Sequence, residues 1–277
     1  MEDGVSAIQM SFGTIYPHPG NYNCCGVIGN ADFANAHTYP QAAPSMLGQY
    51  NGTLDWTHRA ALIPTPGKPV AHTEFGWTTP ASPHYGAVSL RVQAEYTLEF
   101  IFDAWRHGDP IYVYYGLYDD MSGTWGLFDA DNRPRPVALA LQSLSQLLSD
   151  PASDARSFAP GRLNISFAHL PAGKTSFSGG RFLVMQKADG TFWVEIQNEV
   201  IRNNFMGDNS DVPVPEVKLN VNFGSAMRSV TEYDPVSAGT KPVATWRNLS
   251  DVSLSLPARP ILLEVVHPSA RATKELR

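Results

Sequence analysis

The sequence predicts an α/β region followed by an all-β region. Up to about residue 150, short apolar runs alternate with segments of helical periodicity, an alternation typical of a parallel sheet or barrel covered by helices. From residue 156 onward, short β-rich runs are separated by Gly, Pro, Asn and Asp, which is typical of a β-sandwich. We therefore expect a barrel-like domain over residues 1–150, a β-sandwich domain over residues 156–268 and a polar tail over residues 269–277.

The α/β region is expected to contain three strands, each followed by a helix. Pro40 stops the first strand, and Gly and Pro follow the second. The longest helix is recognised by apolar residues at helical spacing, and Gly108 ends it; these residues are Leu90, Ala94, Leu98, Ile101 and Trp105. The expected order is strand 31–39, helix 54–62, strand 69–74, helix 88–107, strand 111–115 and helix 136–148.

The all-β region is expected to contain eight short strands. Asp189 and Gly190 form a dipeptide typical of a hairpin turn. The boundary with the α/β region is expected at residues 149–153. The strands are expected at residues 165–167, 181–187, 191–200, 216–223, 229–233, 243–246, 252–256 and 261–266.

Composition and charge exclude several classes of function. The 277 residues are 43% hydrophobic and 17% charged, with a net charge of −6 and no stretch dense in Lys or Arg, so we expect no nucleic-acid partner. A neutral polymer such as a polysaccharide fits better. Cys24 and Cys25 are adjacent and do not suit an ordinary disulfide, and no cysteine or histidine spacing resembles a zinc site. The sequence has no signal-peptide pattern and no apolar run of roughly 18 residues, so we expect no membrane partner.

The most informative segment is TEFGW at residues 73–77, which ends the second expected strand. An unpaired buried carboxylate costs several kcal/mol, so Glu74 is hard to explain as core packing. It is easy to explain as a catalytic group at the carboxyl end of a barrel strand. A salt-bridged Glu near a strand end is the alternative interpretation.

Other side chains would join Glu74 if three strand ends converge, namely residues 37–39, Glu74 and residues 114–120. Hydrolysis of a glycosidic bond requires two carboxyl groups, and donors such as His37 and Tyr39 would keep one of them ionised and oriented. Aromatic rings would stack on sugars, and the candidates are Trp77, Tyr118 and Trp125. Taken one at a time, these residues are more often structural.

Four segments, in order and spacing, resemble the last three strands of the clan A glycoside hydrolases, which are retaining (β/α)₈ enzymes. They are HTY at 37–39, TEFGW at 73–77, WGLFDAD at 125–131 and RPVALAL at 135–141. The resemblance covers residues 25–148 and implies strands six to eight of such a barrel, with the β-sandwich that often accompanies it. It also implies that Glu74 is the nucleophile and that His37 and Tyr39 support it.

The chain departs from this family at the acid/base residue, which is a Glu, usually in Asn-Glu, ending strand four. Only residues 1–30 precede the expected sixth strand, and of these 6–12 resemble a remnant of strand five. Asn198-Glu199 lies in the β-rich region, after the nucleophile instead of before it, so we do not expect it to be catalytic. The acid/base is therefore expected to come from outside this chain or from a rearranged active site.

Three functions stay open: a retaining glycoside hydrolase acting on β-linked glucan or a related polysaccharide, a non-catalytic carbohydrate-binding module, and a half-barrel interaction module. The expected partners are a carbohydrate and either a second copy of the chain or an N-terminal half that completes the barrel. We expect no cofactor and no metal site, because Asp119-Asp120 and residues 208–211 are only weak candidates for a cation. For a longer parent protein, an extracellular or periplasmic location is expected.

Overall fold

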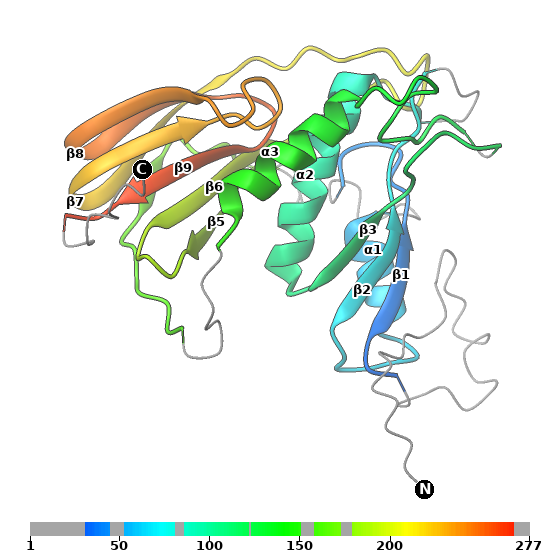
Figure 1. Cartoon of the computed structure of the whole chain (residues 1–277), viewed down its shortest axis with the longest axis horizontal. Helices are drawn as coiled ribbons and strands as arrows, with labels where there is room; N and C mark the ends of the chain where they lie inside the picture. Colours follow the sequence, from blue (N-terminus) through cyan, green and yellow to red (C-terminus); the bar gives the residue numbers. More distant parts are fainter. Residues whose placement is uncertain are drawn as a thin grey trace, which may run out of the picture.

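The computed structural model describes residues 31–44, 53–80, 86–121, 123–150, 158–172 and 179–268. These residues form two sheets with helices between them (Figure 1). The adjacent cysteines, the segment 6–12 and the tail 269–277 lie outside the described residues. No helix of the described part of the chain is long and apolar enough to cross a membrane.

The first sheet has three parallel strands in the order β1-β2-β3. Parallel neighbours require a crossover connection, and a helix lies in each connection, as expected from the sequence. The curled sheet with its helices on one face is the arrangement of part of a (β/α)₈ barrel. The elements are β1 (Ala34–Thr38), α1 (Leu54–Ala61), β2 (Val70–Phe75), α2 (Leu90–His107), β3 (Ile111–Tyr114) and α3 (Pro136–Leu148).

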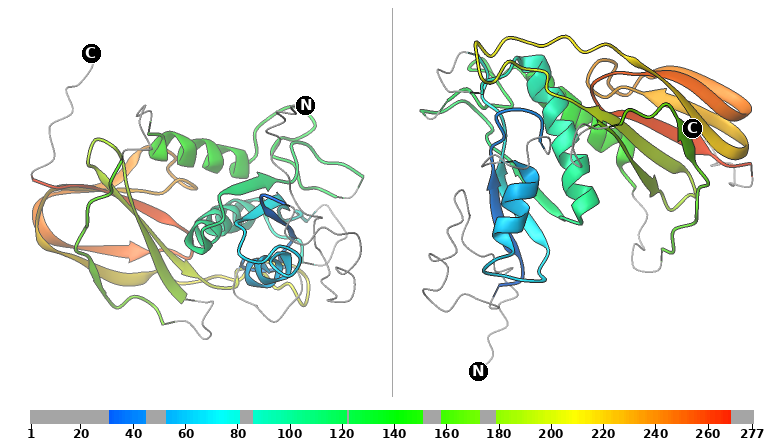
Figure 2. Two further views of the ribbon diagram at one scale, coloured as in Figure 1. Left: turned by 90° about the horizontal axis from the view of Figure 1, so that it is seen from below. Right: turned by 180° about the vertical axis from the view of Figure 1, so that it is seen from behind.

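Helix α2 packs against both sheets (Figure 2). It begins at the N-cap Ser89, whose side chain accepts a hydrogen bond from the N–H of Val92, and it ends at Gly108, whose φ of 83° suits glycine. One face packs against the parallel sheet, where Phe100 stacks on Phe75 with a centroid distance of 4.1 Å. Another face packs with α3 against the second sheet.

The apolar residues whose spacing predicted α2 are not all buried. Leu90 and Trp105 have exposed fractions of 40% and 44%. The buried positions include acidic residues instead, because a third face of α2 lies against arginines of the second sheet and of the segment that follows β6.

The second sheet is antiparallel and contains six strands, in the order β4-β7-β9-β6-β5 with β8 paired to β7. The expected hairpin turn at Asp189 and Gly190 joins β5 to β6, and Gly190 has a φ of 89°. The strands are β4 (Ser166–Ala168), β5 (Gly179–Gln186), β6 (Phe192–Glu199), β7 (Val217–Tyr233), β8 (Pro242–Leu256) and β9 (Ile261–Val266).

Strands β7 and β8 are each longer than the sequence predicted. Each was expected as two short strands, but the pairing continues across a register shift between Asn222 and Met227, so that each pair of short strands is one long strand. All six strands are hydrogen-bonded into one sheet, which encloses one apolar cluster and packs against α2 and α3 through another. The two separate sheets of the expected β-sandwich are therefore not confirmed.

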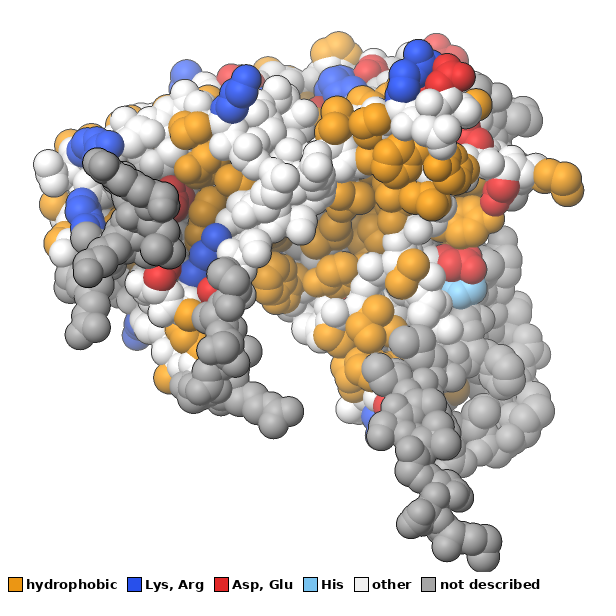
Figure 3. All heavy atoms as spheres, in the orientation of Figure 1, with side chains coloured by type: hydrophobic (Ala, Val, Ile, Leu, Met, Phe, Trp, Pro, Cys, Tyr) orange, Lys and Arg blue, Asp and Glu red, His pale blue; other side chains and the backbone are white. Residues whose placement is uncertain are grey.

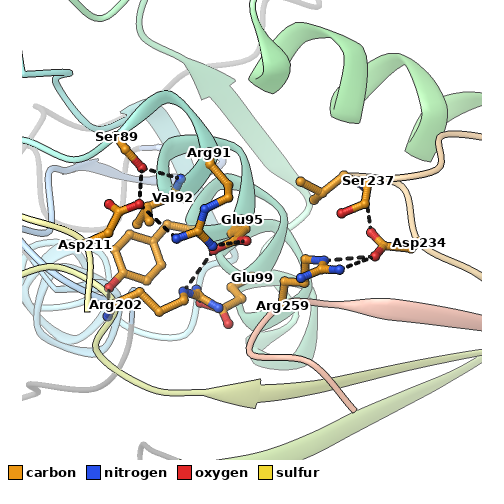
Figure 4. A network of polar contacts seen from close by, with 12 residues as sticks. Ser89, Arg91, Val92, Glu95, Glu99, Arg202, Asp211, Asp234, Ser237 and Arg259 are labelled. Atoms are coloured by element: carbon orange, nitrogen blue, oxygen red, sulfur yellow. Dashed lines mark hydrogen bonds and ion pairs between the residues drawn. The ribbon is translucent and has the colours of Figure 1, made fainter. Parts of the chain in front are cut away.

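A buried cluster of charged residues joins α2 to the β-rich region. Glu95, Glu99 and Asp103 follow one another at intervals of four on α2, and all are at most 1% exposed. Arg202, in the segment after β6, donates to Glu99 at 2.5 Å and lies over the ring of Tyr96 (Figure 4). The other members are Arg106 on α2, Arg181 on β5, and Glu195, Gln197 and Glu199 on β6.

Candidate functional site

The carboxyl ends of β1, β2 and β3 meet at one edge of the parallel sheet, and the residues expected to be functional gather there. His37 lies beside Glu74 in the register of β1 and β2. Tyr39 follows the end of β1, and Tyr115 follows the end of β3. Parallel strands bring their carboxyl ends together, so residues distant in sequence share one site.

A β-bulge in β2 determines the direction in which Glu74 points. Ala36 is paired with His72 and His37 with Glu74, so Thr73 is an extra residue in β2. His72 and Phe75 both contact Phe100 of α2. Strict alternation from His72 would direct Glu74 toward α2 as well. Because of the extra residue, the Glu74 carboxylate lies on the other face of the sheet, beside the end of β1.

Two side chains from the end of β1 hold the Glu74 carboxylate. The Tyr39 hydroxyl donates to Oε2 of Glu74 at 2.6 Å, and Nδ1 of His37 lies 3.3 Å from the same oxygen. The side chains of Glu74 and His37 are 35% and 23% exposed, so the carboxylate is held but still open to a ligand. Burial, and then the hydrogen bond to Glu74, raise the pKa of Tyr39 far above its ordinary value, so Tyr39 is a neutral donor throughout the physiological range.

Tyr39, which holds this carboxylate, belongs to a cluster of three aromatic rings. Tyr39, Tyr115 and Trp125 are packed edge to face, with centroid distances of 5.1 Å for Tyr39–Trp125, 5.9 Å for Tyr115–Trp125 and 6.0 Å for Tyr39–Tyr115. The hydroxyl of Tyr115 donates to Asp120, and the charge of Asp120 also acts on Tyr39. The site therefore contains an aromatic wall and has a second carboxyl group nearby.

The other two aromatic candidates differ in accessibility. Tyr118 is 46% exposed, and its hydroxyl donates to Asn132 at 2.8 Å. Trp77 lies instead in the core between β2 and α2, with 1% exposure and its Nε1 donating to the carbonyl of Ala42 at 3.0 Å. Because both faces of a buried ring are covered, we leave Trp77 out of the proposed sugar-binding surface.

The loop that carries Trp125 is fixed from two sides. The carbonyl of Trp125 accepts from the hydroxyl of Tyr114 at 3.0 Å. Asp119 is held by both terminal nitrogens of Arg135, at 2.9 and 2.6 Å, and by the N–H of Gly126 at 2.8 Å. Partial burial raises the pKa of Asp119, but the hydrogen bonds from Arg135 and Gly126 outweigh it and hold the pKa below its ordinary value. Asp119 is thus a structural anchor, and its oxygens are already engaged.

Glycine at position 76 permits the close approach of the loops that follow β2 and β3. A Cβ atom there would lie 2.6 Å from the carbonyl oxygen of Tyr115. The carbonyl of Trp77 accepts from the side-chain amide of Gln93 on α2 at 2.8 Å, which ties the same loop to the helix. The glycine and tryptophan of the TEFGW segment therefore serve to position Glu74.

The remaining candidates lie elsewhere. In residues 208–211, Oδ1 of Asp208 accepts hydrogen bonds from Ser210 and Asn204, and Oδ2 of Asp211 accepts from Ser89 and Arg91, so this loop docks on the start of α2 (Figure 4). Glu199 is fully buried on β6 within the charged cluster, beside Arg181, as suits a structural residue.

Sequence reasoning included residues 114–120 among the strand ends expected to converge with Glu74, but it gave Tyr115 and Asp120 no individual role there. Taken singly, Tyr115 was assigned to a strand and Asp120 was considered only as part of a cation site. Their positions at the end of an expected strand and in the loop after it were the available signal, since side chains at that place reach the carboxyl edge of a parallel sheet.

The comparisons with known proteins agree with this architecture. No protein-family model and no curated protein matches the sequence. Among solved structures, a family 39 glycoside hydrolase from Bacteroides cellulosilyticus WH2 is similar, with a TM-score of 0.55 and 15% identity over 86% of this chain and 45% of that chain. An α-L-arabinofuranosidase from Thermotoga maritima gives a TM-score of 0.49 and 10% identity over 85% of this chain and 52% of that chain. A GH39 β-xylosidase from Caulobacter crescentus gives 0.45 and 15% over 86% of this chain and 52% of that chain.

At such identities the likeness concerns the fold. The chain covers 45% of the length of the Bacteroides enzyme, whose TM-score is high enough to support the fold assignment. The likeness in fold to a family 39 glycoside hydrolase agrees with the resemblance that the sequence motifs indicated.

Proposed function

We propose that this chain, whose fold is that of part of a glycoside hydrolase, carries the nucleophilic half of a retaining glycosidase site. Glu74 would attack the anomeric carbon of a β-linked glucan or a related polysaccharide and form a glycosyl–enzyme ester. The three parallel strands would correspond to strands six to eight of the barrel. The likeness in fold supports this proposal but does not identify the sugar.

The observation that carries the proposal is the pair of hydrogen-bonding groups on one oxygen of Glu74. A nucleophile must keep one orientation, and the Tyr39 hydroxyl, which donates to the carboxylate at 2.6 Å, meets this requirement. His37 at 3.3 Å limits rotation of the same carboxylate. Tyr115 and Trp125 would offer ring faces and edges to the sugar, with Tyr118 farther along the same loop.

A complete retaining mechanism also requires an acid/base carboxyl group about 5 Å from the nucleophile. We propose that residues outside this chain supply it, and that they pair with the parallel sheet to complete a barrel. Asp120 is the alternative within the chain, because its charge reaches Tyr39. The two possibilities differ in one respect, namely whether this chain alone can cleave a glycoside with a poor leaving group.

A mechanism-based label tests the nucleophile even if the acid is absent. An aryl 2-deoxy-2-fluoro-β-glycoside with a dinitrophenolate leaving group needs no protonation for the first step, and its ester is hydrolysed slowly. We expect intact-mass analysis to show one glycosyl adduct per chain, and peptide mapping to place it on Glu74. A panel of glucosyl, xylosyl and arabinosyl labels would then define the sugar.

Two variants make this test specific. Glu74→Gln has the same size and should give no adduct, whereas Glu216→Gln, a surface variant in the β-rich region, should be labelled like the parent. A folded parent protein that gives no adduct with any of the labels would exclude Glu74 as a nucleophile. If Asp120 is the acid, the parent should turn over unactivated glycosides, and Asp120→Asn should not.

An interaction module is the second candidate function, and the edges of the parallel sheet favour it. Within the described residues, β1 and β3 are each paired on one side only. Val113 and Leu117 near the β3 edge are 51% and 58% exposed, and Figure 3 shows hydrophobic side chains gathered across this face of the molecule. Sedimentation analysis would show a dimer or a complex if this surface pairs with another chain, and a monomer would count against the idea.

A further inference from the structure

A cluster of two histidines and one aspartate lies beneath the parallel sheet, on the face covered by helices. His58 belongs to α1, His72 to β2, and Asp109 to the turn between α2 and β3. Nδ1 of His58 and Nε2 of His72 lie 3.0 and 2.9 Å from the same oxygen, Oδ2 of Asp109. These three atoms lie within 4.8 Å of one another. The cluster therefore brings three potential metal-ligand atoms to one point, separate from the carboxylate of Glu74.

The hydroxyl groups beside His72 indicate where its ring proton lies. The Thr57 hydroxyl donates to the carbonyls of Thr53 and Leu54, at 2.9 and 3.1 Å, as threonines inside helices commonly do. Thr38 Oγ1 lies 2.8 Å from Thr57 Oγ1, so the proton between these two oxygens must come from Thr38. Nδ1 of His72, 2.9 Å from Thr38 Oγ1, must then be the donor in that contact.

Because Nδ1 carries the proton of a neutral His72, its Nε2 carries a lone pair. That lone pair faces the carboxylate oxygen of Asp109 at 2.9 Å. Two lone pairs at that distance repel each other unless a cation lies between them. Nδ1 of His58 lies 3.0 Å from the same carboxylate oxygen, so a third potential ligand atom converges on this point, as a metal ion requires and a single shared proton does not. A divalent metal ion meets the requirement directly.

The surroundings suit such an ion. Two imidazoles and one carboxylate are ligands that zinc accepts, and the Thr38 hydroxyl would orient His72 from behind, as hydrogen-bonded partners of metal ligands do. Ligand atoms of a tetrahedral zinc site are about 3.3 Å apart. The two histidine–aspartate separations, 3.0 and 2.9 Å, would have to lengthen by a few tenths of an ångström, whereas the two histidine nitrogens, which lie within 4.8 Å of each other, would have to move closer. The His58 side chain is 16% exposed and provides access from solvent.

We propose that His58, His72 and Asp109 bind one divalent transition-metal ion of the zinc type, which ties α1, β2 and the turn before β3 together. The ion would be structural, because the site lies on the helical face of the sheet. Nothing in this proposal depends on the function of Glu74.

Cobalt(II) gives the most direct test, because its four-coordinate complexes absorb strongly in the visible range. Chelator-treated protein titrated with Co²⁺ should develop this absorption with an end point of one ion per chain, and Zn²⁺ should displace it. Excess Zn²⁺ should also raise the Tm by about 5 °C, because an ion that binds only the folded state stabilises it. Folded, chelator-treated protein that shows neither the absorption nor the Tm shift would overturn the proposal.

Variants locate the ligands. Asp109→Asn should abolish the absorption, and His58→Gln, at a partly exposed position that tolerates change, should weaken Co²⁺ binding at least tenfold. His107→Gln is the matched control, because its ring packs 4.8 Å from that of His58 but its Nε2 is paired with Asp55. Unchanged Co²⁺ affinity in His58→Gln would overturn the assignment, as would loss of binding in the His107 variant alone.

Discussion

Two groups of carboxylates in this chain have opposite environments. Glu74 lies at the edge of the parallel sheet, 35% exposed, with hydrogen-bonding groups from Tyr39 and His37 on one oxygen. Glu99 of α2 and Glu195 of β6 are fully buried among arginines and other acids. Burial raises the pKa of Glu195 to about 8 and raises that of Glu99 as well, against the attraction of the arginines.

This difference shows that the most perturbed acid is not the one best placed for chemistry. Strongly shifted pKa values often mark functional sites, but structural ion networks produce them too. Glu195 has no access to a ligand, whereas Glu74 has an oriented and open carboxylate. Accessibility and hydrogen-bond geometry thus separate the two groups.

The largest effect is expected from breaking the buried cluster. Arg202 is 2% exposed and pairs with Glu99, so Arg202→Met would leave an uncompensated buried acid and lower the free energy of unfolding by about 3 kcal/mol. Urea denaturation measures this loss. Arg133→Met removes an arginine that is 71% exposed from its pair with Asp129 and should cost less than about 0.5 kcal/mol. Equal losses in the two variants would contradict the structural role of the cluster.

The pH dependence of stability should also identify the buried acids. The pKa of Glu195 rises from 4.5 in the unfolded chain to about 8 in the folded protein, so the folded state binds the proton more tightly. Its stabilising contribution is complete below pH 4.5 and is lost as the pH rises through 8, with a slope of at most about 1.4 kcal/mol per pH unit.

Glu195→Gln copies the neutral acid and checks this sign. The variant should match the parent near pH 5 and should be the more stable protein near pH 9. Chemical denaturation at a series of pH values gives both curves. A variant with the same pH slope as the parent would show that Glu195 is not the titrating group.

A smaller effect is expected at the site of Glu74. Tyr39→Phe removes the donor at 2.6 Å, and we expect the rate of covalent labelling to fall between about tenfold and a hundredfold with little change in stability. Tyr233→Phe is a closely matched control, because it removes a tyrosine–glutamate hydrogen bond in the second sheet, at 3.2 Å from Glu264. Tyr39→Phe should be labelled much more slowly than Tyr233→Phe. Similar labelling rates in the two variants would show that Tyr39 does not act on Glu74.

The smallest effect is expected from a single aromatic ring. Trp125→Ala should weaken oligosaccharide binding about fivefold, because one stacking surface is lost while the hydrogen bonds of Glu74 persist. Trp105→Ala, at a 44% exposed position on α2, should leave the affinity unchanged. Calorimetric titration distinguishes them, and equal affinities would exclude Trp125 from the binding surface.

Much of the secondary structure could be predicted because its signals are local. Gly108 ended α2 and the Asp189–Gly190 turn joined β5 to β6, as expected from backbone preferences that need no tertiary contact. The lengths of β7 and β8 could not be predicted in this way. Hydrogen bonding between β7 and β8 keeps both strands extended in segments whose own preference for strand is weak.

Burial was the property that local sequence patterns predicted least well. Trp77 was expected among the aromatic rings that stack on a sugar but lies in the core, and Trp105, one of the apolar residues whose spacing predicted α2, is exposed. Helical spacing identifies which residues share a face, but not what covers that face. The acidic face of α2 became interior because arginines from the β-rich region lie against it.

The sequence by itself determined the alternation of strands and helices, the TEFGW segment at a strand end, and the resemblance to a glycoside hydrolase barrel. Only the tertiary structure decided that Glu74 meets Tyr39 and His37, because the extra residue Thr73 in β2 is visible only in the pairing with the neighbouring strands. Periodicity is a property of one segment of the sequence. The orientation and burial of a side chain depend on the strand or helix that packs against it, and segments far apart in sequence come together only in the folded chain.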